Sequence, residues 1–360
     1  MNPVPRVYPV SPPENGVYTR GFGECAPRNM LHIPPRVFTR GFLWYGVKAA
    51  SPTAKDRRLN SHHRRAVKTE PNSAPLLMPR ALTLALLRLY DYPDPRRSGR
   101  LIRGYDRAHA LRTARMCAAV AARLSHQPDR LVPYHIACLL HDLGRAGLDR
   151  RLFGRIWSWA KQRGIPTRPR EWRAAHPDTP YGRETEAFLA LYQDELEAAG
   201  IRMDDWAKEQ VEMRLGYARR LARRLRAVKP SLKRLGVRWS PWMGLVMLYY
   251  YYPEKLNGAP RWVRQLAEVL VACEQFEAFS NRRRGRDYYV RTQETLGEAF
   301  AYLEKLQGER ILSERVVNAL RVLAAEGAFD SLLAEARGVA LTSRALRFLR
   351  GLAPGAASCR

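Results

Sequence analysis

The sequence predicts an all-α fold, because apolar residues recur three and four positions apart along nearly all of the chain after residue 77. No run of alternating apolar and polar residues predicts a β-strand. Residues 1–77 differ: they are rich in Pro, Gly and Asn, carry basic clusters at residues 55–58 and 62–65, and show no periodicity. We therefore expect a disordered basic segment, either a tail or an over-extended start of translation, then a helical domain at 78–340 and a C-terminal tail at 341–360.

Two of the predicted helices carry the residues of greatest chemical interest. The first is expected at about residues 108–124, with His109 in its first turn and Met116 and Val120 on its apolar face. The second is expected at about residues 133–143, because Pro133 suits a first turn and Gly144 suits a helix end. Further helices are expected at residues 151–163, 170–175, 183–198, 204–227, 241–250, 261–280, 292–306, 313–324 and 329–336.

The formal net charge of +28 is compatible with nucleic acid, an anionic membrane surface or a phosphorylated small molecule as partner. Arginine is spread over the whole chain, however, and no recognised nucleic-acid-binding module accompanies it, so compositional bias is the favoured explanation. Nucleic acid as a partner thus has no support beyond the charge. The helix expected at 204–227 ends in a basic series interpreted as a solvated face that could also attract phosphate: Arg219, Arg220, Arg223, Arg224 and Arg226.

The cysteines and the hydropathy pattern favour a cytoplasmic protein. The cysteines are odd in number and far apart, which argues against a disulfide framework or a zinc ribbon: Cys25, Cys117, Cys138, Cys273 and Cys359. Three of them, Cys117, Cys138 and Cys273, have apolar neighbours and are expected in the core. The most apolar window, residues 242–252, is shorter than the roughly 20 residues of a membrane-spanning helix, and no secretory signal precedes the domain.

His109 begins one predicted helix, and the pair His141 and Asp142 ends the next. An antiparallel helix hairpin would bring the two sites together. Adjacent residues at a helix end point about 100° apart, so one metal ion could be reached by both His141 and Asp142. Imidazole and carboxylate ligands suit iron, manganese or zinc, and an open coordination position could hold an activated water.

These residues resemble the HD-domain phosphohydrolases, and more narrowly their HD-GYP branch. The resemblance covers roughly residues 100–336 and lies in the following segments: His109 to Arg115, residues 137–145, His176-Pro177 with Gly182, residues 254–258 with Pro260, Leu266 to Ser280 with Arg286 and Tyr288 after it, and residues 329–333. It implies that His109, His141, Asp142 and His176 bind metal, and that Glu274 stands where the branch has an aspartate ligand. It further implies that Asp142 and Arg145 act in catalysis and that Glu254, Asn257 and Arg286 bind substrate.

Several positions depart from the branch's pattern. Two consecutive metal-binding histidines are replaced by Tyr252 and Pro253, the Gly-Tyr-Pro sequence is absent, and Arg145 replaces a lysine. Arginine keeps the positive charge but cannot serve as a general acid. A single divalent ion, of iron, manganese or zinc, is therefore expected.

The resemblance implies hydrolysis of a phosphoester in a nucleotide, with cyclic di-GMP as the specific expectation. An alternative is a catalytically degenerate HD domain that serves as a nucleotide-binding or signalling module, which the missing histidine pair favours. Other features have simpler explanations: His126 and His135 are interpreted as ordinary surface or core residues, and Glu274 could be a polar helix residue beside Glu277. The sequence indicates no oligomeric state.

Overall fold

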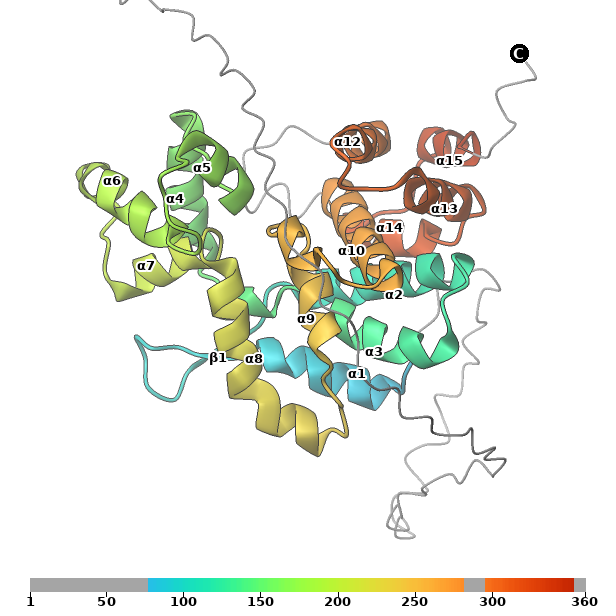
Figure 1. The fold of residues 1–360 in the computed structure, drawn as a ribbon, viewed down its shortest axis with the longest axis horizontal. Coiled ribbons are helices and arrows are strands. Elements are labelled where there is room, and N and C mark those ends of the chain that lie inside the picture. The colour runs from blue at the N-terminus through green and yellow to red at the C-terminus, as the bar shows by residue number, and fades with distance from the viewer. Residues whose placement is uncertain (1–76, 282–294, 353–360) are drawn as a thin grey trace, which may run out of the picture. The chain divides into compact units, whose positions relative to one another are not determined.

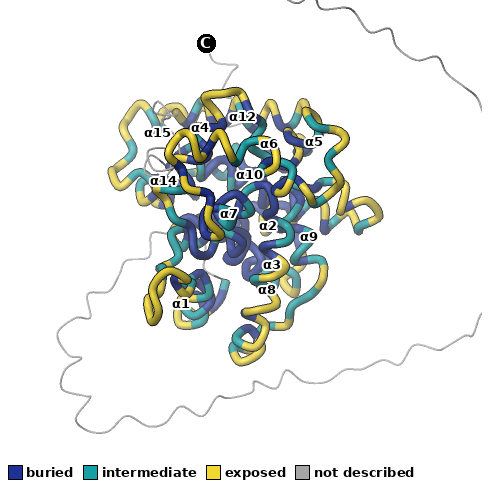
Figure 2. Tube along the Cα trace, turned by 90° about the vertical axis from the view of Figure 1, so that its left-hand side faces the viewer, coloured by how far each residue is buried: buried dark blue, intermediate teal, exposed yellow. Residues whose placement is uncertain are grey.

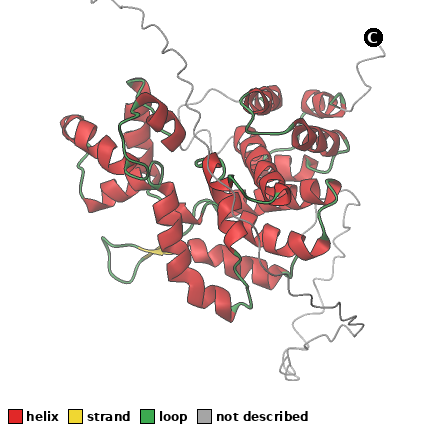
Figure 3. Ribbon diagram, in the orientation of Figure 1, coloured by secondary structure: helices red, strands yellow, loops and turns green. Residues whose placement is uncertain are grey.

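The structure is a computed structural model that describes residues 77–281 and 295–352. In this part of the chain, helices joined by loops form nearly all of the regular structure, which confirms the predicted all-α class (Figure 3). The exception is a short antiparallel pair, β1 (Tyr92–Pro93) with β2 (Leu101–Ile102), too short to leave an alternating pattern in the sequence. The segment expected to be disordered lies outside the described residues apart from residue 77. None of the described helices combines the length and apolar character that crossing a bilayer requires.

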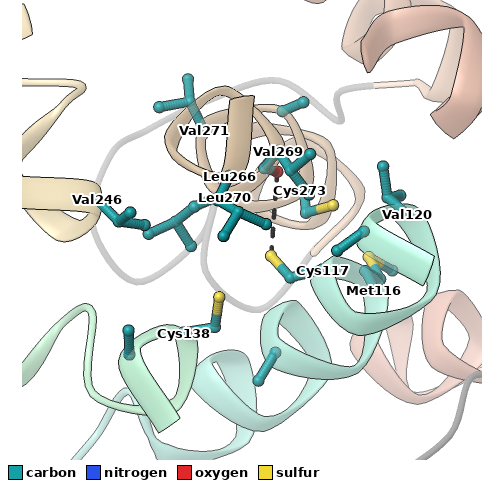
Figure 4. Close-up of a cluster of buried hydrophobic side chains, with 14 of the residues drawn as sticks. Met116, Cys117, Val120, Cys138, Val246, Leu266, Val269, Leu270, Val271 and Cys273 are labelled. Carbon is teal, nitrogen blue, oxygen red and sulfur yellow. Dashed lines mark hydrogen bonds between the residues drawn. The ribbon is translucent and has the colours of Figure 1, made fainter. Parts of the chain in front are cut away.

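Three helices form the centre of the main bundle: α2 (Arg107–Arg123), α3 (Pro128–Leu139) and α10 (Arg261–Ser280) (Figure 1). A short loop at residues 124–127 joins α2 to α3, and α10 packs along α2. Cys117, Cys138 and Cys273 are all buried between these helices as free thiols (Figure 4), as the sequence predicts. Cys25 and Cys359 lie outside the described residues.

Shorter helices surround this centre, and the interior between them is buried (Figure 2). They are α1 (Arg80–Leu87), α8 (Tyr217–Arg234), α9 (Pro241–Leu248), α12 (Leu296–Gly308), α13 (Glu314–Ala325), α14 (Asp330–Arg337) and α15 (Ser343–Arg350). The last of these corrects the expectation of a C-terminal tail at 341–360. Helix α15 packs against α12 and α13 because its apolar residues fall on one face, with Leu349 fully buried.

A second hydrophobic cluster lies in residues 148–215. It is formed by α4 (Arg150–Gln162), α5 (Pro169–Ala175), α6 (Glu184–Ala198) and α7 (Asp205–Glu212). The rings of Trp157, Trp172 and Phe188 meet at its centre. The ring centroid of Phe188 lies 5.4 Å from that of Trp157 and 5.8 Å from that of Trp172. Among residues 77–281 and 295–352 there are also three short 3₁₀ helices: η1 (Arg88–Tyr90), η2 (Leu143–Arg145) and η3 (Pro253–Leu256).

Several predicted boundaries are wrong, including two helix ends: α3 ends at Leu139 rather than at 143, and α8 ends at Arg234 rather than at 227. Helix α3 begins at Pro128 rather than Pro133, since Pro128 takes the first position and Pro133 lies inside the helix. The helix expected at 204–227 is two helices, α7 and α8, separated at residues 213–216. Gly216 is needed at this break, because an added Cβ would lie 2.5 Å from Glu212 Cγ and 2.7 Å from Thr185 Oγ1.

The arginine series at the start of α8 is the solvated face that the sequence suggested only in part: Arg223 and Arg226 are exposed, whereas Arg220 is buried. Arg219 pairs with Glu186 at 2.6 Å and Arg223 pairs with Glu212 at 2.5 Å. Arg220 is 1% exposed and donates hydrogen bonds to the carbonyls of Gly144 and Ala146, both at 2.8 Å. This arginine therefore holds the backbone that follows His141 and Asp142.

We predict that Arg220→Ala lowers the free energy of unfolding by about 3 kcal/mol, because it leaves two buried carbonyls without donors. The matched control is Arg226→Ala on the same helix, where the side chain is exposed and a change within about 0.5 kcal/mol is expected. Urea unfolding curves, compared at the same dependence of the free energy on urea concentration, give the change in the free energy of unfolding for both variants. Equal midpoints for the two variants would contradict this role of Arg220.

Candidate metal centre

The hairpin of α2 and α3 brings His109, near the start of α2, to His141 and Asp142, just after the end of α3. All three side chains are buried, with residue exposures of 3%, 6% and 2%. The Nε2 atoms of His109 and His141 each lie 3.7 Å from Asp142 Oδ2, and the two rings meet edge to face with centroids 5.2 Å apart. Two atoms that bind one ion at about 2.1 Å cannot lie more than about 4.2 Å apart, and both separations meet that limit.

The protonation of His141 suits metal binding. Its Nδ1 lies 2.7 Å from the carbonyl oxygen of Cys138, and a carbonyl can only accept, so Nδ1 carries the proton. The lone pair is therefore on Nε2. That atom is buried and has no hydrogen-bond partner among the described residues. A buried acceptor without a partner is costly, and a metal ion is the partner that this arrangement fits.

His109 is oriented by a buried carboxylate on α10. Its Nδ1 is hydrogen bonded to Glu277, which is fully buried. Arg112 Nε donates to the other oxygen of Glu277 at 2.7 Å, and Asn281 donates to the same oxygen at 3.3 Å. Because the carboxylate accepts from Nδ1, His109 presents Nε2 toward Asp142. A carboxylate behind a histidine is the usual support of a metal ligand, since it fixes the ring and raises its basicity.

Two tyrosine hydroxyls hold the backbone around the pair. Tyr90 donates to the carbonyl of Leu139 at 2.9 Å and accepts from the N–H of Asp142 at 3.2 Å. Tyr217 donates to the carbonyl of His141. Burial, followed by the nearby charge of Asp142, raises the pKa of both tyrosines well above its ordinary value, so both hydroxyls stay protonated. Gly144 permits the approach of Tyr217, whose ring would lie 2.6 Å from an added Cβ.

Arg145 lies beside the cluster. Its Nη1 is 3.3 Å from Asp142 Oδ2, and its Nη2 donates to the hydroxyl of Tyr251 at 3.2 Å. The turn of η2 produces this contact, because Arg145 lies three positions after Asp142. A cation next to the candidate ligands can stabilise negative charge on a bound phosphate.

The other residues predicted for the site do not join His109, His141 and Asp142, which form the one group of potential ligands found in the described residues. His176 is half-buried and stacks on Trp172 with centroids 4.1 Å apart. Glu274 is half-buried on α10, one turn before Glu277. Glu254 lies 3.6 Å from Arg173, Asn257 is exposed after η3, and Arg286 lies outside the described residues.

Some residues of the site were not anticipated from the sequence. Glu277 is the main one, and Arg112, Tyr90 and Tyr217 are the others. A signal for Glu277 was present, since it lies at helical spacing from Leu270 and Cys273 on the buried face of α10. His135 is an ordinary core residue, as interpreted from the sequence: burial lowers its pKa to about 4, which keeps it neutral.

Comparisons with protein-family models, with curated proteins and with solved structures found no match to this chain. The chemistry of the centre therefore follows from its own residues. His109, His141 and Asp142 form a buried group that could hold a metal ion.

We predict that protein purified without a metal-binding tag contains roughly one equivalent of a divalent transition metal and that His141→Ala abolishes this content, because it removes the Nε2 donor. His176→Ala is the matched control and should retain the metal, since His176 stacks on Trp172 away from the group. Elemental analysis of folded protein measures both. Loss of metal from the His176 variant, or its retention in the His141 variant, would refute this ligand set.

We also predict that Glu277→Gln weakens metal affinity by about 10- to 100-fold, because the amide supports His109 less well than the carboxylate. Competition with a chelator of known affinity measures the change. Glu274→Gln, on the same helix, should leave the affinity unchanged. If the two variants have equal affinity, Glu277 is not the support of His109.

Proposed function

We propose that this protein is an HD-type, metal-dependent phosphohydrolase that acts on a phosphoester of a nucleotide. The observation that carries the proposal is the buried Nε2 of His141, which lacks a hydrogen-bond partner among the described residues and lies 3.7 Å from Asp142 Oδ2. Hydrolases of several unrelated kinds use such a set of nitrogen and carboxylate ligands around one ion.

In this proposal His109, His141 and Asp142 hold one divalent ion of iron, manganese or zinc. When bound, the ion supplies Lewis acidity and lowers the pKa of water so that hydroxide is available near neutral pH. Asp142 helps to orient the attacking water. Arg145 binds the phosphate and stabilises the charge that develops on its oxygens, because its guanidinium lies 3.3 Å from Asp142 and is fixed by Tyr251.

A phosphate-bearing substrate is supported by the charge around the centre. The side chain of Arg145 is 15% exposed, so it can contact a ligand while it stays paired with Asp142. Arg173 donates to the carbonyl of Tyr251 at 3.2 Å, but its charge is paired with Glu184 at 2.9 Å, so Arg145 is the cation on which this support rests. The resemblance to the HD-GYP branch narrows the proposed substrate to cyclic di-GMP. Tyr252 and Pro253 replace the two consecutive histidines with which that branch binds metal, which argues for one ion rather than two.

The second candidate function is a degenerate HD domain that binds a nucleotide without turning it over. One specific observation favours it. Tyr252, where the HD-GYP branch has a histidine, is 1% exposed, lies under the guanidinium of Arg173 at 4.9 Å and packs on Tyr181. That position therefore serves packing rather than metal binding.

Hydrolysis of bis(p-nitrophenyl) phosphate and of cyclic di-GMP by protein loaded with Mn²⁺, Fe²⁺ or Zn²⁺ tests the proposal. We predict turnover that His141→Ala abolishes and that Arg145→Ala lowers by about 10²- to 10³-fold in kcat with the metal retained. Arg151→Ala, an exposed arginine on α4, is the control and should match the wild type. Metal-loaded wild type with no more hydrolysis than the His141 variant would refute the hydrolase, and nucleotide binding by that protein would favour the binding module.

A further inference from the structure

A pocket of about 280 Å³ lies where α5, the chain after α9, and α12 meet. We call it the tyrosine pocket, because Tyr250, Tyr251 and Tyr302 line it; Arg168 and Lys305 are further lining residues. Its size is at the lower end of small-molecule sites, which suits one nucleoside unit rather than a whole dinucleotide.

The tyrosine pocket adjoins the metal centre through Tyr251. The hydroxyl of Tyr251 accepts from Arg145, which lies 3.3 Å from Asp142. The ring of Tyr251 also packs on Tyr217 with centroids 4.9 Å apart, and Tyr217 donates to the carbonyl of His141. A ligand in the pocket would therefore sit one side chain away from the residues proposed to bind phosphate.

The aromatic wall of the pocket is fixed before any ligand binds. The hydroxyls of Tyr250 and Tyr302 are hydrogen bonded at 2.8 Å, and the ring of Tyr302 stacks on Phe279 with centroids 4.8 Å apart. Arg168 donates to the hydroxyl of Tyr302 at 3.2 Å and lies 5.5 Å from the ring centre of Tyr250. Tyrosine rings held in this way offer flat faces on which a nucleobase can stack at little entropic cost.

The lining of the pocket has a small positive excess. Arg168, Arg170 and Lys305 line it with two carboxylates, those of Glu171 and Glu309, with which they form ion pairs. Arg214 lies close behind: burial, and then the positive charge of Arg168 and of Arg145, lowers its pKa to about 9. It stays charged at neutral pH and adds to a potential that attracts an anion.

We propose that the tyrosine pocket binds the base of one nucleotide of the substrate and directs the attached phosphate toward Arg145 and the metal centre. This inference rests on the proposed function, because it identifies the part of the substrate recognised beside that centre. The aromatic wall recognises the base, whereas the arginines attract the phosphate.

Equilibrium binding of GMP and of ribose 5-phosphate to the chelated full-length chain tests the proposal, since the two probes share the phosphate and differ in the base. The wild type should bind GMP about tenfold or more tightly than ribose 5-phosphate. Tyr302→Leu should remove that preference, and Tyr250→Leu should do the same from a different element, which guards against a folding defect at either position. Tyr192→Leu, on α6 outside the pocket, should keep it.

Equal binding of the two probes to the wild type, no binding of either, or a preference that survives in both pocket variants while they remain folded would overturn the proposal. The outcome is separable from that of the proposed function. If the wild type hydrolyses the substrate but shows no preference for the base, the pocket proposal is refuted and the hydrolase proposal stands. If the pocket variants abolish a preference for the base but the wild type hydrolyses nothing, the pocket proposal stands and the hydrolase proposal is refuted.

Discussion

The buried carboxylate of Glu277 joins the packing of the helices to the chemistry of the centre. A carboxylate with no exposure would cost several kcal/mol if it lacked partners, so its contacts with His109 and Arg112 must persist in the folded state. Those contacts link α10 to α2. Arg112 also donates a hydrogen bond from Nη1 to Glu335 Oε1 on α14 at 3.0 Å, which links α2 to α14. A shift of any of these helices would separate charges, which explains why the imidazole of His109 is held in one orientation.

His141 is held by a different kind of constraint. Its Nδ1 donates to the carbonyl of Cys138 in the preceding helix α3, while Tyr217 and Arg220 on α8 donate to the carbonyls of His141 and Gly144. One ligand is thus positioned by a carboxylate from α10 and the other by the backbone of α3. Because the supports come from separate elements, the space between the two Nε2 atoms is set by packing of the whole bundle rather than by a local loop.

The sequence predicted the parts of the site that depend on local spacing. His109 at the start of one helix, with His141 and Asp142 after the next, was enough to predict their meeting, since a short loop between helices leaves few alternatives. The choice between Glu274 and Glu277 depends on how α10 is rotated about its axis. That rotation is set by Leu266, Cys273 and Phe276 against α2, which is tertiary packing. The roles of Tyr90 and Tyr217 could not be predicted for the same reason, because these residues lie 49 and 76 positions along the chain from the carbonyls of Leu139 and His141 that they bind.

The arginine series of α8 shows that the exposure of a charged residue cannot be predicted from composition alone. Five arginines on one predicted helix resemble a solvated or phosphate-binding face. Arg223 and Arg226 are indeed exposed, but Arg220 is buried, and Arg219 and Arg223 are paired with carboxylates. The buried or half-buried positive groups on this side of the molecule are instead Arg145, which donates to Tyr251, Arg168, which donates to Tyr302, and Arg214, whose pKa the charges of Arg168 and Arg145 lower. Mutual repulsion among them is the electrostatic cost of this arrangement, and a bound phosphate would offset it. Under the proposed function, the phosphate of the substrate would be the group that lowers this electrostatic cost.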